Sequence, residues 1–396
     1  MRGATCVPPG TWFDPAINST IGIQHLLTRV RTKDIVLLGE THAIGDHHRW
    51  HLQTVAQLHA LNPDLILGFE AFPRRVQNAL DRWVAGELSE KEFIQESDWE
   101  TVWKYDVNFY MPLFHFARMN KIPMVALNVD RALIRKVSSD GWKNVPQNQR
   151  RGIGDPKPAS QPYIDMLGEV YGQHSTRSGK ESETNGPPKG PGLEDPMFSN
   201  FVDVQLTWDR AMAEAANTAV KTARAKGRAP QLVAIVGRGH MDNFLGIPEQ
   251  LKDLGQSNFA VLTPWDKMRK CADLTNQNGT AAADAVYGIA LTKDTFSAAK
   301  PKLGVLIENG DDGVLVGAVV KKSIAEKAGI KKDDVILEAA GQKVTKVGEL
   351  ISIIKSVSPG TWLPLHVKRG KEMMELVAQF PSESEPDKPK TVHGKK

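Results

Sequence analysis

The chain has 396 residues, 41% of them hydrophobic, and this length allows a large core together with a second domain. Its formal net charge of +4 is spread along the chain, which gives little support to nucleic-acid binding. No run approaches the roughly 18 apolar residues of a membrane-spanning helix, and the first residues lack the apolar core of a signal peptide. Taken alone, these features predict a cytoplasmic protein of two domains.

The two cysteines, Cys6 and Cys271, lie far apart without a metal-binding spacing, so the sequence indicates neither a disulfide framework nor a zinc knuckle. Residues 4–10 nevertheless resemble the junction at which bacterial lipoproteins are cleaved and lipidated on cysteine, although the apolar stretch that should precede it is missing. Either the start is assigned too late or Cys6 is an ordinary terminal residue. The first alternative, which we favour, predicts a lipid anchor at Cys6 and a periplasm-facing location in the bacterial cell envelope. The second leaves a cytoplasmic location.

Four apolar runs of strand length, residues 34–38, 64–69, 122–127 and 232–236, are each closely followed by polar side chains. We interpret the runs as parallel neighbours in an α/β fold, with a mostly parallel sheet flanked by helices. Such sheets bind ligands beyond the carboxyl ends of their strands. The polar residues expected to gather there are Glu40, His42, Glu70, Asn128 and His240.

The same Gly-x-x-His pattern follows two of these runs, at residues 39–42 and 237–240. Glycine lets the backbone turn sharply without a steric penalty, and the histidine three residues later offers a titratable ring that can bind a metal. Either copy alone is a weak signal. Two copies at one edge of a sheet predict a functional site.

A histidine-rich helix is predicted directly after the first copy. Helical periodicity places His48 on one stripe with Leu52 and Val55, and this stripe should face the sheet. His47 and His51 fall four residues apart on a flanking face, which could hold a metal but is more often a solvated polar face. We therefore prefer His48 to His47 as a site residue.

Aromatic residues crowd the segment from Trp99 to Phe116. Most of them are expected to cap the core, and the alternative is an aromatic wall around a flat apolar ligand such as a porphyrin. In that second case Tyr105 and Tyr110 would supply phenolate ligands to haem iron.

Imidazole and carboxylate groups together suit a divalent metal ion, for which Glu40, His42 and His240 are the predicted ligands. Glu40 or Glu70 could then act as the general base that activates a metal-bound water for hydrolysis. The sequence has no G-x-S-x-G, H-E-x-x-H or G-x-x-x-x-G-K-[ST] motif, and no G-x-G-x-x-G after a strand. Serine hydrolases, zincins, nucleotide hydrolases and Rossmann-type dehydrogenases are therefore disfavoured.

Composition divides the chain into segments. The first domain spans residues 10–267 and contains a flexible insertion at 144–193, rich in Gly, Pro and Ser, that a helix interrupts at Tyr163 to Tyr171. A polar, alanine-rich linker is predicted at 268–300. A small mixed β/α module follows at 301–380, and the polar tail at 381–396 should be disordered.

The first domain resembles the ChaN-type proteins, the haem-binding, iron-uptake branch of a superfamily that also contains Tiki metalloproteases, TraB proteins and erythromycin esterases. The matching motifs are residues 35–42, His47-His48, Gly68-Phe69-Glu70, Leu127-Asn128 with Arg131, Gln205 with residues 209–213, and residues 237–241. The resemblance implies a functional centre, catalytic in the enzymes of the superfamily, made of Glu40, His42, Glu70, Arg131 and His240. The candidate haem-contacting residues are His42, His48, Tyr105, Tyr110 and His240.

The second module resembles a bacterial PDZ domain. Residues 301–305 look like its carboxylate-binding loop and first strand, residues 323–330 like its short helix, and residues 348–350 like the start of the helix beside its groove. Such domains take up an extended peptide as an added strand, with backbone amides holding the terminal carboxylate. The expected peptide-binding residues are Leu303, Gly304 and Val305. The alternative is a module that packs only on its own chain.

Two functions stay open at this point, and so does the question of whether the chain is an enzyme. The resemblance favours a haem- or iron-binding protein of the cell envelope, whose PDZ-like module docks a partner protein. The residue chemistry favours a metal-dependent peptidase or esterase. The expected cofactor is accordingly haem or a divalent metal ion of undetermined identity. An interaction scaffold with an inactive site is a third alternative.

Overall fold

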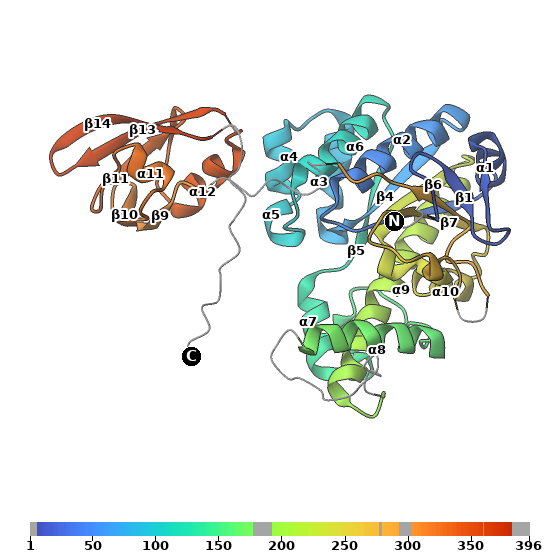
Figure 1. Ribbon diagram of the computed structural model, residues 1–396. Helices are drawn as coiled ribbons and strands as arrows, with labels where there is room; N and C mark the ends of the chain where they lie inside the picture. The colour runs from blue at the N-terminus through green and yellow to red at the C-terminus, as the bar shows by residue number, and fades with distance from the viewer. Residues whose placement is uncertain (1–5, 177–191, 277–278, 293–301, 359, 382–396) are drawn as a thin grey trace, which may run out of the picture. The chain divides into compact units, whose positions relative to one another are not determined.

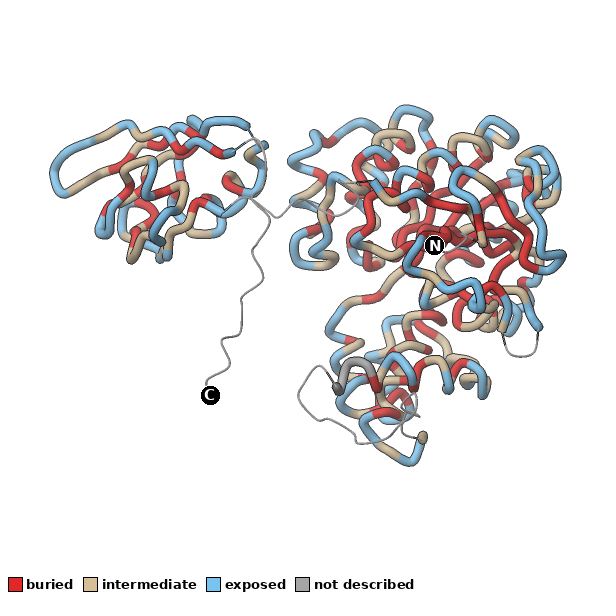
Figure 2. The backbone as a smooth tube through the Cα atoms, in the orientation of Figure 1, coloured by how far each residue is buried: buried red, intermediate tan, exposed pale blue. Residues whose placement is uncertain are grey.

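The computed structural model divides into two compact units, Met1–Phe296 and Ser297–Lys396 (Figure 1). It describes residues 6–176, 192–276, 279–292, 302–358 and 360–381. Each unit has its own hydrophobic core, and Figure 2 shows the buried stretches gathered inside each of them.

The first unit is built on an eight-stranded sheet in the order β2-β1-β8-β7-β3-β6-β4-β5. Neighbouring strands from β8 to β5 are parallel, whereas β1 pairs antiparallel with β8 and β2. The prediction of an α/β fold with a mostly parallel sheet is confirmed. The strands are β1 (Trp12–Asp14), β2 (Ser19–Ile21), β3 (Ile35–Glu40), β4 (Leu65–Pro73), β5 (Met124–Asn128), β6 (Gln231–Gly237), β7 (Phe259–Trp265) and β8 (Ala285–Gly288).

Helices cover both faces of this sheet, which explains why β3, β4, β6 and β7 are buried along their whole length. Val36 and Leu38 of β3 point to one core and Ile35 and Leu37 to the other, as the two-residue period of a strand requires. The first core lies under α1 (Ile23–Val30), α2 (Gly45–Leu61), α3 (Gln77–Ala85), α4 (Glu90–Glu96), α5 (Trp99–Val102) and α6 (Val107–Met119). The second lies under α9 (Pro196–Ala225) and α10 (Ile247–Asp253).

The region predicted as a flexible insertion contributes buried residues to two small cores that it shares with α9. Val145 and Ile153 join helix α7 (Arg131–Asp140) and α9 in one small core, and α8 (Gln161–Thr176) forms another with α9 through Tyr163. The helix predicted at Tyr163 to Tyr171 is thus present, but flexibility is the wrong prediction for residues 144–176. The Gly- and Pro-rich composition of this segment obscured the few apolar residues that pack against α9. Residues 177–191 lie outside the described part of the chain.

The linker predicted at 268–300 is also wrong for its described part. Residues 271–274 form a 3-10 helix, and β8 inserts between β1 and β7 as a full member of the sheet. The first unit therefore continues beyond residue 267. A strand of only four residues carries too little pattern to be recognised in an alanine-rich sequence.

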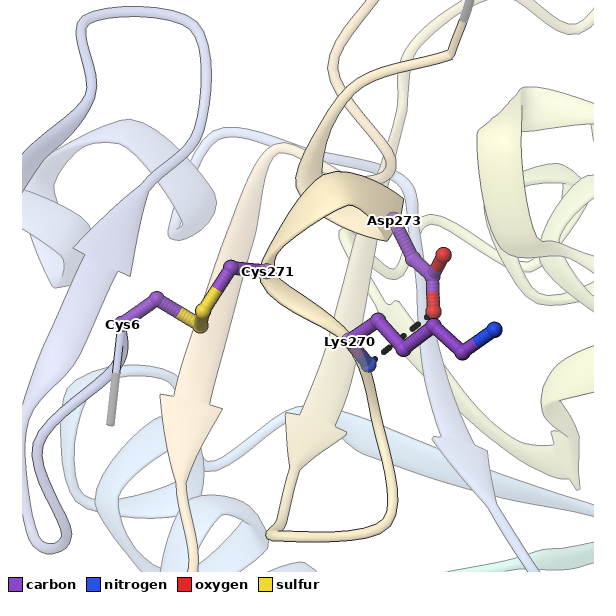
Figure 3. The surroundings of a disulfide bond; sticks show 4 residues. All are labelled: Cys6, Lys270, Cys271 and Asp273. Atoms are coloured by element: carbon purple, nitrogen blue, oxygen red, sulfur yellow. Dashed lines mark hydrogen bonds between the residues drawn. A yellow bond between two sulfur atoms is a disulfide. The ribbon is translucent and has the colours of Figure 1, made fainter. Parts of the chain in front are cut away.

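Cys6 and Cys271 form a disulfide, with their Cα atoms 5.6 Å apart (Figure 3). Cys271 is the first residue of the 3-10 helix, and at the same end of this helix the carboxylate of Asp273 accepts a hydrogen bond from the backbone N–H of Lys270. The prediction that no disulfide is indicated was wrong, because a pair 265 residues apart has no recognisable spacing. The sulfur of Cys6 is used in this bond. It therefore cannot also carry the thioether of the lipid anchor expected there.

The second unit is an antiparallel sheet in the order β14-β13-β11-β10-β9, in which β12 pairs with β11. Its described part also contains the helices α11 and α12. Strand β9 pairs only with β10, so the other edge of β9 is open to a further strand within the described structure. The predicted small β/α module is confirmed. Its elements are β9 (Val305–Asn309), β10 (Val314–Val319), α11 (Ile324–Lys327), β11 (Val335–Ala339), β12 (Gln342–Lys343), α12 (Val347–Ser356), β13 (Trp362–Arg369) and β14 (Glu372–Gln379).

Of the tail expected to be disordered, residues 382–396 lie outside the described part of the chain. A search of the described helices finds none with both the length and the apolar character needed to cross a bilayer.

The disulfide should stabilise the first unit, since it joins residues 265 positions apart and so restricts the unfolded chain. Replacing both cysteines by serine should lower its free energy of unfolding by about 2–5 kcal/mol. Urea unfolding monitored by tryptophan fluorescence would measure the loss. A reductant should destabilise the wild-type protein and leave the double variant unchanged; equal effects on both would contradict the prediction.

Candidate functional site

Strands β3 and β6 lie side by side in parallel, and their register pairs Glu40 with Gly237. Both Gly-x-x-His segments therefore leave the sheet at the same edge, as the sequence predicts. A Cβ atom at Gly237 would lie 2.8 Å from Cε1 of His42 and 3.0 Å from its Nε2. Glycine is thus required at the second motif because the histidine ring of the first lies against its backbone.

The carboxylate of Glu40 is the centre of a buried polar cluster. Its Oε1 accepts hydrogen bonds from Nδ1 of His42 at 2.6 Å and from the hydroxyl of Tyr110 at 2.5 Å. Its Oε2 faces Nδ1 of His48 at 3.4 Å and Nδ1 of His51 at 3.5 Å. Burial alone would raise the pKa of Glu40, but His48, His42 and His51 hold it well below its usual range. Glu40 is accordingly a carboxylate with no access to solvent.

Glu70 joins the two motif histidines. Its Oε2 accepts from the backbone N–H of Gly237 at 2.5 Å, while its Oε1 lies 4.0 Å from Nε2 of His42 and 3.7 Å from Nε2 of His240. Burial lowers the pKa of His42, but Glu70 and Glu40 outweigh burial and raise it. The two rings therefore face one shared carboxylate.

His240 is oriented by a second buried carboxylate that our sequence predictions did not assign to the site. Its Nδ1 lies 2.7 Å from Oδ1 of Asp209 on α9, and Oδ2 of Asp209 accepts from the hydroxyl of Tyr163 at 2.6 Å. Asp209 is completely buried. A carboxylate between apolar residues of a long helix was the available signal, whereas nothing in the sequence pointed to Tyr163.

A cavity of about 860 Å³ opens beside these groups. One part of its wall is aromatic and contains Trp103, Tyr105 and Trp208. The ring centroid of His42 lies 4.6 Å from that of Trp103 and 5.1 Å from that of Tyr105. Another part is basic. The cations of the wall are Arg75, Lys104, Arg131, Arg135 and Arg151, and its acidic residues are Glu70 and Asp130.

The predicted functional centre is largely brought together. His42, Glu70, Arg131 and His240 line the cavity, while Glu40 lies behind His42. Arg131 is in the wall, where its guanidinium donates to the carbonyl of Val102. Asn128 contributes to the wall as well, but its side chain is hydrogen-bonded to the backbone of residues 70 and 129.

The two tyrosines have separate roles. Tyr105 lines the cavity and is 38% exposed. Tyr110 is 2% exposed, and its hydroxyl donates to Glu40 and accepts from the indole N–H of Trp103. Burial and the Glu40 carboxylate raise the pKa of Tyr110, which keeps its hydroxyl protonated. The structure thus places the Tyr110 hydroxyl against Glu40, and Tyr110 is not among the residues that line the cavity.

The histidines of α2 are arranged differently from the sequence prediction. His47, His48 and His51 are all buried, so a solvated face for His47 and His51 is wrong. His47 accepts from the backbone N–H of Thr41 and pairs with Asp266 at 3.0 Å. His48 faces Glu40 and not the cavity, which removes it from the haem-contacting set.

The predicted metal ligands Glu40, His42 and His240 do not converge on one point. His42 is hydrogen-bonded to Glu40, whereas His240 reaches Glu70 and Asp209. Within the described residues, the group whose ligand atoms all lie within 4.8 Å is Glu40, His48 and His51. In this group, His48 and His51, three residues apart on α2, take the places that the sequence prediction gave to His42 and His240 of the two Gly-x-x-His motifs.

In the second unit, the predicted peptide-binding residues lie where the first strand begins. Leu303 is 2% exposed and belongs to the core, so its side chain anchors the loop. Gly304 has a φ of +84°, and a Cβ there would lie 2.3 Å from Cβ of Ser323. Val305 opens the edge strand β9.

His240 should give the first unit a measurable pH dependence. Burial disfavours its imidazolium, but Asp209 and Glu70 outweigh burial and raise its pKa to about 9, from 6.5 in the unfolded chain. The stabilisation is complete below pH 6.5 and is lost as the pH rises through 9. NMR titration of the ring should show a lower pKa in Asp209→Asn. The free energy of unfolding of that variant should also fall less over this pH range; an unchanged pKa would refute the assignment.

Comparisons with known proteins agree with this architecture. A family model described as "Haem-binding uptake, Tiki superfamily, ChaN" matches residues 26–251, and a PDZ domain model matches residues 301–379. A solved structure titled "Cofacial heme binding to ChaN of Campylobacter jejuni" is 16% identical, covers 70% of this chain and 95% of that chain, and has a TM-score of 0.52. At 16% identity, this similarity shows that the two proteins share a fold and nothing more.

Curated relatives match over a short stretch. A "Probable periplasmic serine endoprotease DegP-like" from Chlamydia muridarum is 39% identical over 74 residues, and its counterpart from Chlamydia trachomatis has the same values. The match covers 18% of this chain and 15% of each relative. The first family model covers more than half of the chain. The chain therefore belongs to the ChaN family of haem-binding uptake proteins in the Tiki superfamily, and it also carries a PDZ domain.

Proposed function

We propose that the first unit binds haem in the cavity beside His42. The observation that carries the proposal is the lining of this cavity, which combines aromatic side chains, basic side chains and the titratable ring of His42. The volume of about 860 Å³ lies within the range of about 300–1,000 Å³ usual for small-molecule sites. A porphyrin needs a flat apolar surface, cations for its propionates and one side chain for its iron.

The residues present meet these requirements. Trp103 and Trp208 offer apolar faces, and Arg131 and Arg135 offer guanidinium groups that suit carboxylates. Tyr105 is the best candidate for the iron, since it lines the cavity and no other side chain in the described part of the chain is hydrogen-bonded to its hydroxyl. Burial lowers the pKa of His42, but Glu70 and Glu40 outweigh burial and favour the protonated ring, which offers no lone pair to iron. When bound, haem iron would accept a phenolate or an imidazole as a ligand.

The alternative of a metal-dependent hydrolase is not favoured by the geometry. Glu40, one candidate general base, is 2% exposed and surrounded by rings on both oxygens, so it cannot reach a substrate in the cavity. Glu70, the other candidate, uses one oxygen for the backbone N–H of Gly237. A general base must come within hydrogen-bond reach of the proton it removes.

Haemin titration tests the haem site. Purified protein should give a shifted Soret band with a defined stoichiometry, and Tyr105→Phe should change the position of that band because the phenolate ligand is lost. Arg131→Ala should weaken binding roughly tenfold, as expected for one charge-assisted hydrogen bond.

The matched control is Tyr171→Phe, which removes a tyrosine hydroxyl from α8, where the ring packs on Phe198 and Phe201. This variant should retain the wild-type spectrum and affinity. Absence of a Soret shift in the wild-type protein, or equal effects of Tyr105→Phe and Tyr171→Phe, would rule out the proposed site.

We propose that the PDZ domain binds a peptide C-terminus along β9. This strand is at the edge of its sheet, and the preceding loop is fixed because the carbonyls of Leu303 and Gly304 accept from the backbone N–H groups of Ala325 and Val320. Ile351 on α12 is 38% exposed and offers an apolar contact. This arrangement is typical of peptide binding by strand addition.

Binding of short peptides with an apolar C-terminal residue, followed by calorimetry, tests this assignment. Amidation of the peptide C-terminus should weaken binding about 10–100-fold, because the charge-assisted hydrogen bonds to the carboxylate are lost. Ile351→Glu should weaken all such peptides, and Glu375→Gln on the opposite edge strand should weaken none. Equal affinity for the free and the amidated peptide would exclude carboxylate recognition.

We also propose that the protein works in the bacterial cell envelope. The disulfide between Cys6 and Cys271 supports this location, since disulfides persist in oxidising compartments such as the periplasm and are rare in the cytosol. The PDZ domain would then bring the haem-binding unit to a protein partner there. Thiol labelling of the protein in intact cells would show both cysteines blocked if the location is right and free if it is cytoplasmic.

A further inference from the structure

A second group of potential ligands lies behind the cavity. His48 and His51 are one helical turn apart on α2, and both rings point to Glu40 at the end of β3. Glu40, His48 and His51 are 2%, 5% and 0% exposed. None of the three lines the cavity assigned to haem.

The protonation of both rings follows from their outer nitrogens. Nε2 of His51 lies 2.9 Å from the carbonyl oxygen of Gly39, and Nε2 of His48 lies 3.1 Å from that of His42. A carbonyl oxygen can only accept, so each Nε2 must carry a proton. In a neutral imidazole the lone pair is then on Nδ1. Histidines that bind metals are commonly held in the same way, with the second ring nitrogen donating to a backbone carbonyl.

Both Nδ1 atoms face the same carboxylate oxygen. Oε2 of Glu40 is 3.4 Å from Nδ1 of His48 and 3.5 Å from Nδ1 of His51. Oε2 of Glu40 and Nδ1 of His51 are both buried and without a hydrogen-bond partner within the described structure. Lone pairs that converge in a buried space repel one another unless a proton or a metal ion lies between them.

The spacing fits a transition-metal ion. Zinc lies about 2.0–2.2 Å from histidine nitrogen and carboxylate oxygen, and a tetrahedral arrangement then separates two ligand atoms by about 3.3–3.5 Å. The two distances to Oε2 fall in or at the edge of this range, and all three ligand atoms lie within 4.8 Å of one another. Two imidazoles and one carboxylate are also a donor set that zinc and its first-row neighbours prefer.

We propose that Oε2 of Glu40, Nδ1 of His48 and Nδ1 of His51 bind one divalent first-row metal ion, for which Zn²⁺ is the best match. The site is separate from the haem pocket and does not depend on haem binding. Its three protein ligands leave one position for a water molecule. Because these ligands come from α2 and from the end of β3, the ion would hold α2 on the end of β3. It also fixes the carboxylate whose other oxygen orients His42.

Metal titration of the purified full-length chain tests this site. After removal of metal with a chelator, the wild-type protein should bind one equivalent of Zn²⁺, measured by elemental analysis after gel filtration, and its melting temperature should rise. Co²⁺ should give the strong visible absorption of a tetrahedral complex. His51→Gln should weaken binding by at least about 100-fold, the upper end of the loss when an outer-sphere partner of a metal site is removed.

Two controls separate this site from other histidines. His59→Gln alters a histidine on the same helix, and His240→Gln alters the cavity; both variants should keep one equivalent of metal and the Co²⁺ spectrum. If binding is lost in His240→Gln and kept in His51→Gln, the proposal is wrong. If His51→Gln does not fold, nitrogen NMR of wild-type histidines decides. Imidazolium signals from His48 and His51 with no response to Zn²⁺ would show that protons occupy this space, and would overturn the proposal.

Discussion

The buried carboxylate of Glu40 is the group on which the arrangement of the first unit depends. A negative charge with 2% exposure is stable only if polar partners surround it, and here the partners come from three elements: the segment after β3, helix α2 and helix α6. Each partner is therefore held in one orientation. His42 is aimed at Glu70, and the Tyr110 hydroxyl is withdrawn from the cavity.

This constraint separates the cavity from the cluster behind it. The cavity wall includes aromatic rings, such as those of Tyr105 and Trp208, that can contact a ligand. The cluster behind it consists of groups whose atoms are directed at one another. His42 belongs to both, since Nδ1 contacts Glu40 and Nε2 faces Glu70 at the cavity. A change in either region would reach the other through this one ring.

The sequence was sufficient for the features that depend on local pattern. Strands buried on both faces are continuous apolar runs, and parallel strands end at one edge, so Glu40, His42, Glu70 and His240 could be predicted to lie near one another. The choice between neighbouring residues was not predictable. Tyr105 and Tyr110 lie in one aromatic stretch, and only packing decides that one reaches the cavity and the other Glu40. His51 looked solvated because a periodicity argument cannot show that two faces of α2 are covered.

The disulfide has a mechanical consequence for the edge of the sheet. Strands β1 and β2 end the sheet on one side and, being short, offer little resistance to being pulled away. Cys6 precedes them and is bonded to Cys271, which follows the long parallel strand β7. A stretching force applied to the chain before Cys6 would pass through the sulfur atoms to the end of β7. Most of that load would bypass β1 and β2, which could stay paired while the protein is held by its amino-terminal end.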